Sequence, residues 1–322
     1  MATQNTPNRM ILVSVPRTAS NLLLKVLNIP KQPNVITSPK GGYFFYDAFM
    51  TAGKDGRFNK AIGEWTQEEK SEVHKAFQHA VTDLEEYSAR AHAENKMIFA
   101  KEHAFWFLNP GFFSGMTHGA VSDEDLKSFQ VTLAFIIRHP ALAWPSLYRA
   151  MQKMCKAGFL EDDDAKGVSL TNMSMQWTRR LFDWCLEQPD APVTPLVIDA
   201  NDVIHNPGAV IKFCERAGMD TGSMQFEWKD NERKSETWTP DRASADNPAE
   251  LARHQKAASI MLSSLEGSTG INKEKAPTSI DIDAEVVKWR AEFGDEVAEL
   301  LEKATRDAMP DYEYLKANRV TA

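Results

Sequence analysis

The sequence has little of several features that mark particular protein classes. Its three cysteines, Cys155, Cys185 and Cys214, form no CxxC or Cys/His spacing, so we expect reduced thiols rather than a disulfide framework or a zinc site. Apolar runs such as residues 131–137 are far shorter than the roughly 20 residues that a membrane helix needs. The N-terminal MATQNTPNR lacks the apolar stretch of a secretory signal. We therefore expect a cytoplasmic protein without a membrane partner.

The chain also has no excess of positive charge. Its 37 Lys and Arg residues stand against 45 Asp and Glu residues, a net charge of −8, which repels a polyphosphate backbone. Nucleic acid is therefore not an expected partner, although a local basic site can still hold one small anion. Hydrophobic residues (43%) and charged residues (25%) are at the levels of soluble globular proteins. The 322 residues are predicted to form one domain, 1–322.

Short apolar runs alternate with helical patterns along most of the chain. The predicted strands are 10–15, 34–37, 97–100, 131–137 and 194–199. The predicted helices are 21–27, 66–94, 141–154, 172–187, 207–217, 248–265 and 283–308. This alternation predicts an α/β fold, a parallel sheet with helices on both faces. We expect a helical cap region over about 54–95 and a helical C-terminal part over about 245–310.

The first site candidate is VPRTASN, residues 15–21, between the first strand and its helix. A turn there directs backbone N–H groups and the positive end of a helix toward the sheet edge, which suits an anion. Arg17 adds a cation, and Thr18, Ser20 and Asn21 add short polar side chains. The alternative is a helix capped by Thr18 or Ser20 with Arg17 in solvent. The two glycines and the lysine of a Walker motif are absent, which disfavours nucleotide hydrolysis.

The second candidate is FAKEH, residues 99–103, where an apolar strand ends in two basic side chains. Ligands of open α/β sheets gather outside the carboxyl ends of the strands, so Lys101 and His103 are expected near the first loop. His103 titrates near neutrality and is a candidate general base. A structural role for this histidine is the alternative.

The third candidate lies in IIRHPALAWPSLYR, residues 136–149. Arg138 ends an apolar strand, Pro140 suits the first turn of the next helix, and Ser146 follows about two turns later. An arginine and a serine in these places can hold a second phosphate from two directions. The alternative is an arginine at a helix cap and a serine on a helix face.

Taken together, these patterns resemble the sulfotransferase family, whose members use 3′-phosphoadenosine 5′-phosphosulfate as the sulfuryl donor and have a fold like that of P-loop nucleoside triphosphate hydrolases. The likeness covers roughly residues 10–235. The family's PKSGTTW motif, which holds the 5′-phosphosulfate, is similar to Pro16, Arg17, Thr18, Ala19, Ser20, Asn21 and Leu22. A KTH-type strand end, with its histidine as catalytic base, matches Lys101, Glu102 and His103.

The resemblance also implies a 3′-phosphate site. Arg138 and Ser146 match the family's arginine and serine there, and Arg233 and Lys234 match its RKG loop. The implied reaction transfers a sulfuryl group to a hydroxyl of a small, aromatic or apolar acceptor and releases 3′-phosphoadenosine 5′-phosphate. The implied catalytic residues are His103, Lys101 and Arg17, and no metal is needed. We expect a monomer or a weak homodimer.

Four departures from the family pattern bear on the donor. Arg17 replaces the usual lysine, and an arginine cannot donate a proton at neutral pH. Ala19 and Ser235 replace glycines, and Leu22 stands where an adenine-stacking tryptophan is common. Trp228 is a candidate to supply that ring face instead.

Other functions stay open on the sequence. The same fold could serve dehydration, cyclisation or isomerisation of a small metabolite, with His103 as acid or base. A nucleotide kinase would rest on LVID, residues 196–199, as a Walker B strand end. A binding module without catalysis is a further alternative. The aromatic residues Tyr43, Phe44, Phe45, Tyr46, Phe105, Trp106, Phe107, Phe112 and Phe113 suit either an acceptor pocket or the core.

Overall fold

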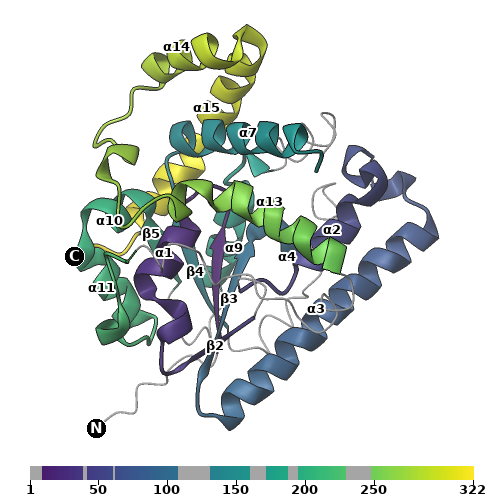
Figure 1. Ribbon diagram of the computed structural model, residues 1–322, viewed down its shortest axis with the longest axis vertical. Helices are drawn as coiled ribbons and strands as arrows, with labels where there is room; N and C mark the ends of the chain where they lie inside the picture. The colour runs from purple at the N-terminus through teal and green to yellow at the C-terminus, as the bar shows by residue number, and fades with distance from the viewer. Residues whose placement is uncertain are drawn as a thin grey trace.

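The computed structural model describes residues 9–38, 42–60, 62–107, 131–159, 172–187, 195–229 and 248–322. Its centre is one five-stranded sheet in the order β2-β3-β1-β4-β5 (Figure 1). Every neighbouring pair of strands is parallel. The strands are β1 (Arg9–Ser14), β2 (Val35–Thr37), β3 (Met97–His103), β4 (Val131–Ile137) and β5 (Leu196–Asp199). The predicted parallel sheet is confirmed.

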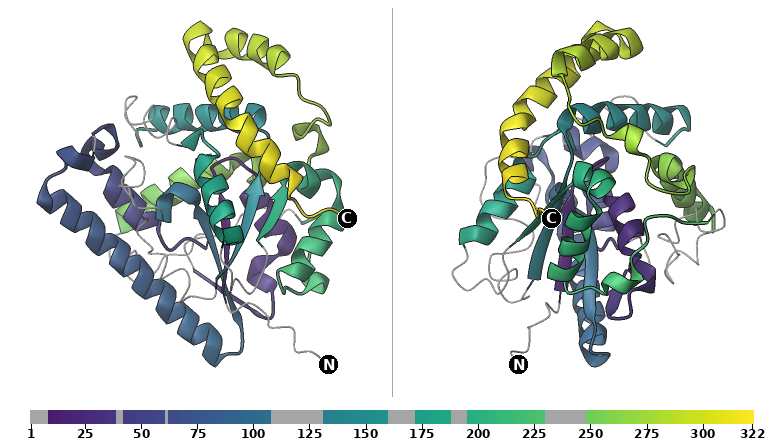
Figure 2. Two further views of the ribbon diagram at one scale, coloured as in Figure 1. Left: turned by 180° about the vertical axis from the view of Figure 1, so that it is seen from behind. Right: turned by 90° about the vertical axis from the view of Figure 1, so that its left-hand side faces the viewer.

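Alternation along each strand divides the core into two layers, because successive side chains point to opposite faces of a sheet. Met10 and Leu12 of β1 pack on one face, with α1 (Ser20–Leu27), α10 (Ala200–His205) and α11 (Pro207–Arg216). Ile11 and Val13 pack on the opposite face. Figure 2 shows the sheet with helices on both of its faces. The helices of that layer are α2 (Tyr46–Gly53), α3 (Gln67–Ala93), α4 (Ala104–Phe107), α7 (Pro140–Lys156), α9 (Gln176–Glu187), α14 (Ile282–Phe293) and α15 (Asp295–Ala317).

The long helix α13 (Pro248–Glu266) contacts both α1 and α7 and so links the two layers (Figure 1). Short 3-10 turns connect the larger elements: Ile29–Lys31, Lys54–Asn59, Ile62–Glu64, Thr221–Ser223 and Lys273–Lys275. No helix of the described residues combines the length and the apolar character needed to cross a membrane.

The prediction of one continuous helix over 283–308 is wrong. The chain forms α14 and α15 instead, separated at Gly294, whose φ of 86° and ψ of 170° lie in a region open essentially only to glycine. The short helices α2 and α10 were not predicted, and β3 runs three residues further than predicted, through His103.

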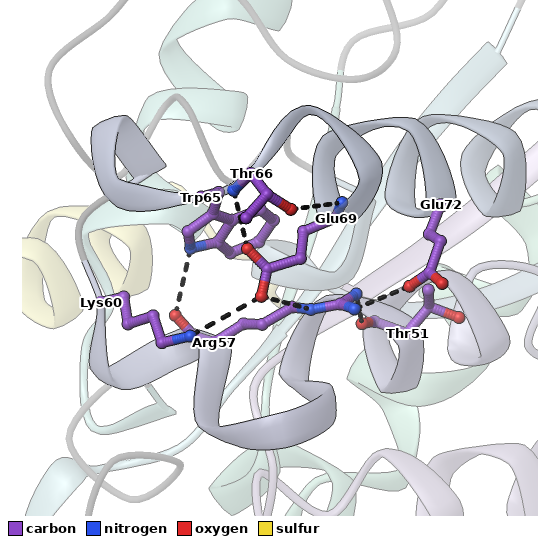
Figure 3. A network of polar contacts seen from close by, with 7 residues as sticks. All are labelled: Thr51, Arg57, Lys60, Trp65, Thr66, Glu69 and Glu72. Atoms are coloured by element: carbon purple, nitrogen blue, oxygen red, sulfur yellow. Dashed lines mark hydrogen bonds and ion pairs between the residues drawn. The ribbon is translucent and has the colours of Figure 1, made fainter.

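A buried arginine ties α2 to the start of α3 (Figure 3). The guanidinium of Arg57 donates to the Thr51 carbonyl at 3.0 Å and to Glu72 Oε2 at 2.6 Å, and it lies 3.6 Å from Glu69 Oε1. Thr66 and Glu69 form a capping box that begins α3. The cap region expected over about 54–95 thus consists of helical elements, which pack on α2, β2 and β3. Its role as a cover over the site stays a prediction.

Candidate functional site

The carboxyl ends of β1, β3 and β4 bring the predicted site residues to one edge of the sheet. Ser14 and His103 are paired in register, and Lys101 lies two residues before His103. Because Met10, Leu12 and Phe99 face the α1 layer, the same alternation places Ser14, Lys101 and His103 on that side. Three strand ends therefore meet the first loop and the start of α1.

The first loop has two non-glycine residues in the left-handed region, Arg17 (φ 71°) and Ala19 (φ 65°). Ala19 is the N-cap of α1 and supplies no side-chain hydrogen bond to the helix end. Thr18 is buried, and its hydroxyl donates to the Val15 carbonyl at 2.8 Å. The alternative of a helix capped by Thr18 or Ser20 is therefore wrong. The first N–H groups of α1 are available for an anion.

The two arginines lie together at this loop. Arg138 Nη1 donates to the Arg17 carbonyl at 3.0 Å, and Arg17 Nε donates to Ser146 Oγ, also at 3.0 Å. Arg17 Nη1 further donates to the Met261 carbonyl of α13, so Arg17 is not a solvent-exposed cation. Burial lowers the pKa of Arg17. Burial, and then repulsion by Arg17, lowers the pKa of Arg138 to about 10. An anion bound here would relieve both effects.

Lys101 brings a third cation to the loop. Its side chain is buried, and Nζ donates to Asn21 Oδ1 of α1 at 2.6 Å. Burial lowers its pKa to about 7, opposed by the charge of Glu102. We call Arg17, Lys101 and Arg138 the cationic cluster. The two arginines stay protonated at neutral pH, and Lys101, with a pKa of about 7, is protonated in part. Their setting is poorly hydrated, so electrostatic attraction for an anion is stronger there than in water.

His103 lies two residues after Lys101 on the same face of β3, and both of its ring nitrogens have a hydroxyl neighbour. Nδ1 is 2.9 Å from Ser14 Oγ, and Nε2 is 3.3 Å from the hydroxyl of Tyr43. Burial lowers the pKa of His103 well below its usual 6.5, and the charge of Lys101 lowers it further. The imidazole is therefore neutral near pH 7 and carries a lone pair that can accept a proton.

Glu102, between the two basic residues, points to the other face of the sheet. Its Oε1 accepts hydrogen bonds from the backbone N–H groups of Phe44 (2.6 Å) and Phe45 (3.2 Å). Burial raises the pKa of this carboxyl group to about 8. The carboxyl group anchors the segment that carries Tyr43. The contacts of Ser14, Tyr43 and Glu102 with one another's strands and with His103 were not predicted from the sequence, although Ser14 is a polar residue at the end of an apolar strand.

The described aromatic residues pack in one core layer, and some of them also contact His103. Phe44, Phe45, Phe105 and Trp106 are buried in the layer beside α2 and α3, and Tyr43 packs against it. The ring centroids of Tyr43 and His103 are 5.6 Å apart, and those of Trp106 and His103 are 4.5 Å apart. Whether any of these rings lines an acceptor pocket stays a prediction.

Some predicted residues cannot be placed at the site. Arg233, Lys234 and Ser235, with Phe112 and Phe113, lie outside the described residues. Trp228 is buried; its indole donates to the Ser268 carbonyl at 2.6 Å, and Lys25 Nζ lies 5.1 Å from its ring. Within the described ranges, no three His, Cys, Asp or Glu side chains are grouped as a metal site.

Comparisons with known proteins show which family this chain is similar to. Sulfotransferase ppzF from Metarhizium rileyi (strain RCEF 4871) is 34% identical over 350 aligned positions, covering 98% of this chain and 97% of the relative. The protein of the same name from Metarhizium majus (strain ARSEF 297) is 34% identical and covers 98% of both chains. No family model matches the sequence.

Two solved structures also match. The sulfotransferase domain from the Synechococcus PCC 7002 olefin synthase and that from the curacin biosynthetic pathway each have a TM-score of 0.40 and 14% identity. The matches cover 91% and 89% of this chain, respectively, and 97% of each structure.

The fold is a parallel α/β sheet with basic side chains, Arg17, Lys101 and Arg138, at the carboxyl ends of its strands. The full-length likeness then makes the assignment specific: the chain belongs to the sulfotransferase family and is an enzyme of that type.

Proposed function

We propose that the enzyme transfers a sulfuryl group from 3′-phosphoadenosine 5′-phosphosulfate to a hydroxyl group of a small acceptor. The arrangement that supports this most strongly is a neutral imidazole, His103, on the same face of β3 as Lys101, whose ammonium bonds Asn21 at the loop that also carries Arg17. Arg138 in turn donates to the carbonyl of Arg17. A phosphosulfate with an additional phosphate is multiply anionic, and its transfer needs a proton acceptor next to the charge stabilisers.

The described residues fit such a donor. The uncapped N-terminus of α1, with Arg17 and Asn21 beside it, would hold the 5′-phosphosulfate. Arg138 and Ser146, both bonded to Arg17, would hold the 3′-phosphate. Thr18 would contribute through its backbone, because its hydroxyl already donates to Val15. Arg233 and Lys234 stay predicted members of the 3′-phosphate site.

In this mechanism the donor, when bound, supplies an activated sulfuryl group and leaves as the bisphosphate. His103 Nε2 accepts the proton of the acceptor hydroxyl. Lys101 and Arg17 stabilise the charge that grows on the departing phosphate and on the sulfuryl oxygens. A positioned base contributes about 10²- to 10⁴-fold to the rate, and a preorganised charge stabiliser contributes about 10²- to 10³-fold. The catalytic residues that we assign are thus His103, Lys101 and Arg17.

The second candidate is the same fold used for dehydration, cyclisation or isomerisation of a small metabolite. Arg17 in the lysine position and the strained Ala19 favour it, because both alter the loop that would hold the donor. Binding of 3′-phosphoadenosine 5′-phosphate separates the two, since only sulfuryl transfer requires that nucleotide. A small-molecule acceptor and a monomer or weak homodimer in the cytoplasm remain part of the proposal.

The test of the proposed base is His103→Ala in the full chain, assayed for transfer of ³⁵S from the labelled donor to a panel of phenols and alcohols. We expect transfer to be lost while the affinity for 3′-phosphoadenosine 5′-phosphate stays close to that of the wild type. His205→Ala is the control, since His205 bonds the Ala276 carbonyl away from the strand ends. Loss of nucleotide affinity equal to the loss of transfer would make His103 a structural residue.

A further inference from the structure

The hydrogen bonds around His103 favour one tautomer of the imidazole. The Ser14 hydroxyl lies 3.3 Å from the Glu102 carbonyl, to which it can donate, and 2.9 Å from His103 Nδ1. With the hydroxyl proton on the carbonyl, the Ser14 oxygen accepts from Nδ1–H, so we assign the proton to Nδ1 and the lone pair to Nε2. A proton acceptor at this site therefore acts through Nε2.

The hydroxyl of Tyr43 already occupies that lone pair, donating to Nε2 at 3.3 Å. The Tyr43 ring is held on two sides: Lys101 Nζ lies 4.4 Å from the ring centroid, and the Trp106 ring lies 4.7 Å away. The tyrosine backbone is fixed independently of the ring. Gly42, just before it, accepts from the Lys101 N–H at 2.9 Å, and Glu102 anchors the two residues after it.

An acceptor hydroxyl must hydrogen-bond to the same nitrogen before its proton can move. One lone pair cannot accept from two hydroxyl groups in line, so Tyr43 has to leave when the acceptor binds. Because the backbone at residues 42–45 is anchored to β3, rotation of the Tyr43 side chain is the movement that requires least change. Its departure would expose both the Trp106 ring and the Lys101 ammonium.

We propose that Tyr43 is a specificity-determining residue: its phenol caps the base and is exchanged for an acceptor that has an aromatic ring bearing a hydroxyl. This rests on the proposed role of His103. Such an acceptor regains all three contacts that Tyr43 gives up, namely Nε2, the Trp106 ring and the Lys101 cation. A saturated alcohol regains only the hydrogen bond and so displaces Tyr43 less effectively.

The first test measures access to Nε2 without needing an acceptor or a donor. Diethyl pyrocarbonate carbethoxylates the imidazole of His103, and the rate is followed by the mass of its peptide. We expect Tyr43→Ala to react about tenfold faster than the wild type, and Tyr43→Phe, which keeps the ring and loses the hydroxyl, about two- to tenfold faster. Tyr46→Ala is the matched control, since Tyr46 packs on Trp106 as Tyr43 does; it should react like the wild type.

The same reaction tests the aromatic preference. Added p-cresol, the side chain of tyrosine as a free molecule, should restore protection of His103 in Tyr43→Ala, whereas 1-hexanol at equal concentration should not. Equal labelling rates in the wild type, Tyr43→Ala and Tyr43→Phe would overturn the capping role. Equal protection by p-cresol and 1-hexanol would overturn the preference for an aromatic acceptor.

A second test links the capping role to the reaction. With the sulfuryl donor present, Tyr43→Ala should form p-cresyl sulfate with a kcat/KM about tenfold above that of the wild type, since p-cresol no longer competes with the Tyr43 phenol. If neither the wild type nor any variant transfers a sulfuryl group or binds the bisphosphate, the proposed function is wrong. A higher labelling rate of His103 in Tyr43→Ala than in the wild type would then still support the capping role of Tyr43. If transfer depends on His103 but the labelling rate and kcat/KM are the same with and without the Tyr43 side chain, the inference about Tyr43 is wrong and the proposed function is unaffected.

Discussion

Arg138 donates a hydrogen bond from its guanidinium to the backbone carbonyl of Arg17, 121 residues away in the chain, at 3.0 Å. This contact joins the end of β4 to the loop after β1 and holds two cations beside each other. Burial and then the charge of Arg17 lower the pKa of Arg138, while the charge of Asp199 raises it. A bound dianion would favour the charged form of both arginines, and the first prediction follows from this.

Arg138→Ala should weaken the binding of 3′-phosphoadenosine 5′-phosphate by about 10- to 100-fold, because a hydrogen bond between charged groups is worth roughly 1.5–3 kcal/mol. Isothermal titration calorimetry measures the change in Kd. Arg149→Ala is the control: Arg149 lies on α7 like Ser146, but pairs with Glu292 at 2.6 Å. An unchanged Kd in Arg138→Ala would place the nucleotide elsewhere.

Lys101→Met should raise the pKa of His103. The imidazole pKa is lowered by burial and then by the Lys101 charge, so removing that charge favours the protonated ring. Since only the neutral ring accepts a proton, the fall in activity on the acid side moves to higher pH. The pKa is measured directly by NMR titration of ¹⁵N-histidine-labelled protein. Lys96→Met, which removes a surface lysine paired with Glu94, should leave it unchanged; an equal or lower value in Lys101→Met contradicts the prediction.

Ala19→Gly should stabilise the free protein by about 1 kcal/mol, because an L-residue in the left-handed region costs about 1–2 kcal/mol and the added flexibility of glycine in the unfolded chain offsets part of this. Ala19 has a φ of 65°. Urea unfolding gives the change in free energy. Ala89→Gly, at an exposed position inside α3, should instead destabilise by about 1 kcal/mol. If both variants change the free energy of unfolding in the same direction, the loop at Ala19 is not strained.

Glu102→Gln should gain stability relative to the wild type as the pH rises from 5 to 9. Burial raises the pKa of Glu102 from 4.5 to about 8, so folding favours its protonated form. The wild type loses that contribution as the pH rises from 4.5, where the carboxyl ionises in the unfolded chain, to about 8, where it ionises in the folded state as well. A glutamine does not titrate, and its oxygen can still accept from Phe44 and Phe45. The difference in free energy of unfolding should grow by about 1 kcal/mol or more over this range. A difference in free energy of unfolding between Glu102→Gln and the wild type that stays constant with pH would contradict this prediction.

Much of the site follows from two simple rules applied to the sequence. Parallel strands end at a common edge, which brings Lys101, His103 and Arg138 to one place. Alternation along β1 and β3 then puts Ser14, Lys101 and His103 on the α1 side. Ser14 is a polar residue at the end of an apolar run, a pattern that indicates a hydrogen-bond partner on a neighbouring strand, here β3.

The remaining features depend on contacts between distant segments. Nothing near Met261 in the sequence indicates that its carbonyl would accept from Arg17. Tyr43 reaches His103 only because Glu102, on the opposite face of β3, anchors the backbone beside it. The left-handed backbone at Arg17 and Ala19 is equally hard to predict, because neither residue type favours it.

The central claim is that the cationic cluster and the start of α1 bind a doubly phosphorylated adenosine. Calorimetric titration of the wild-type chain with 3′-phosphoadenosine 5′-phosphate tests it most directly. We expect saturable binding at one site with a Kd of about 1 μM, weakened by Arg138→Ala and nearly unaffected by His103→Ala. The absence of any saturable heat at nucleotide concentrations up to about 1 mM would contradict the account.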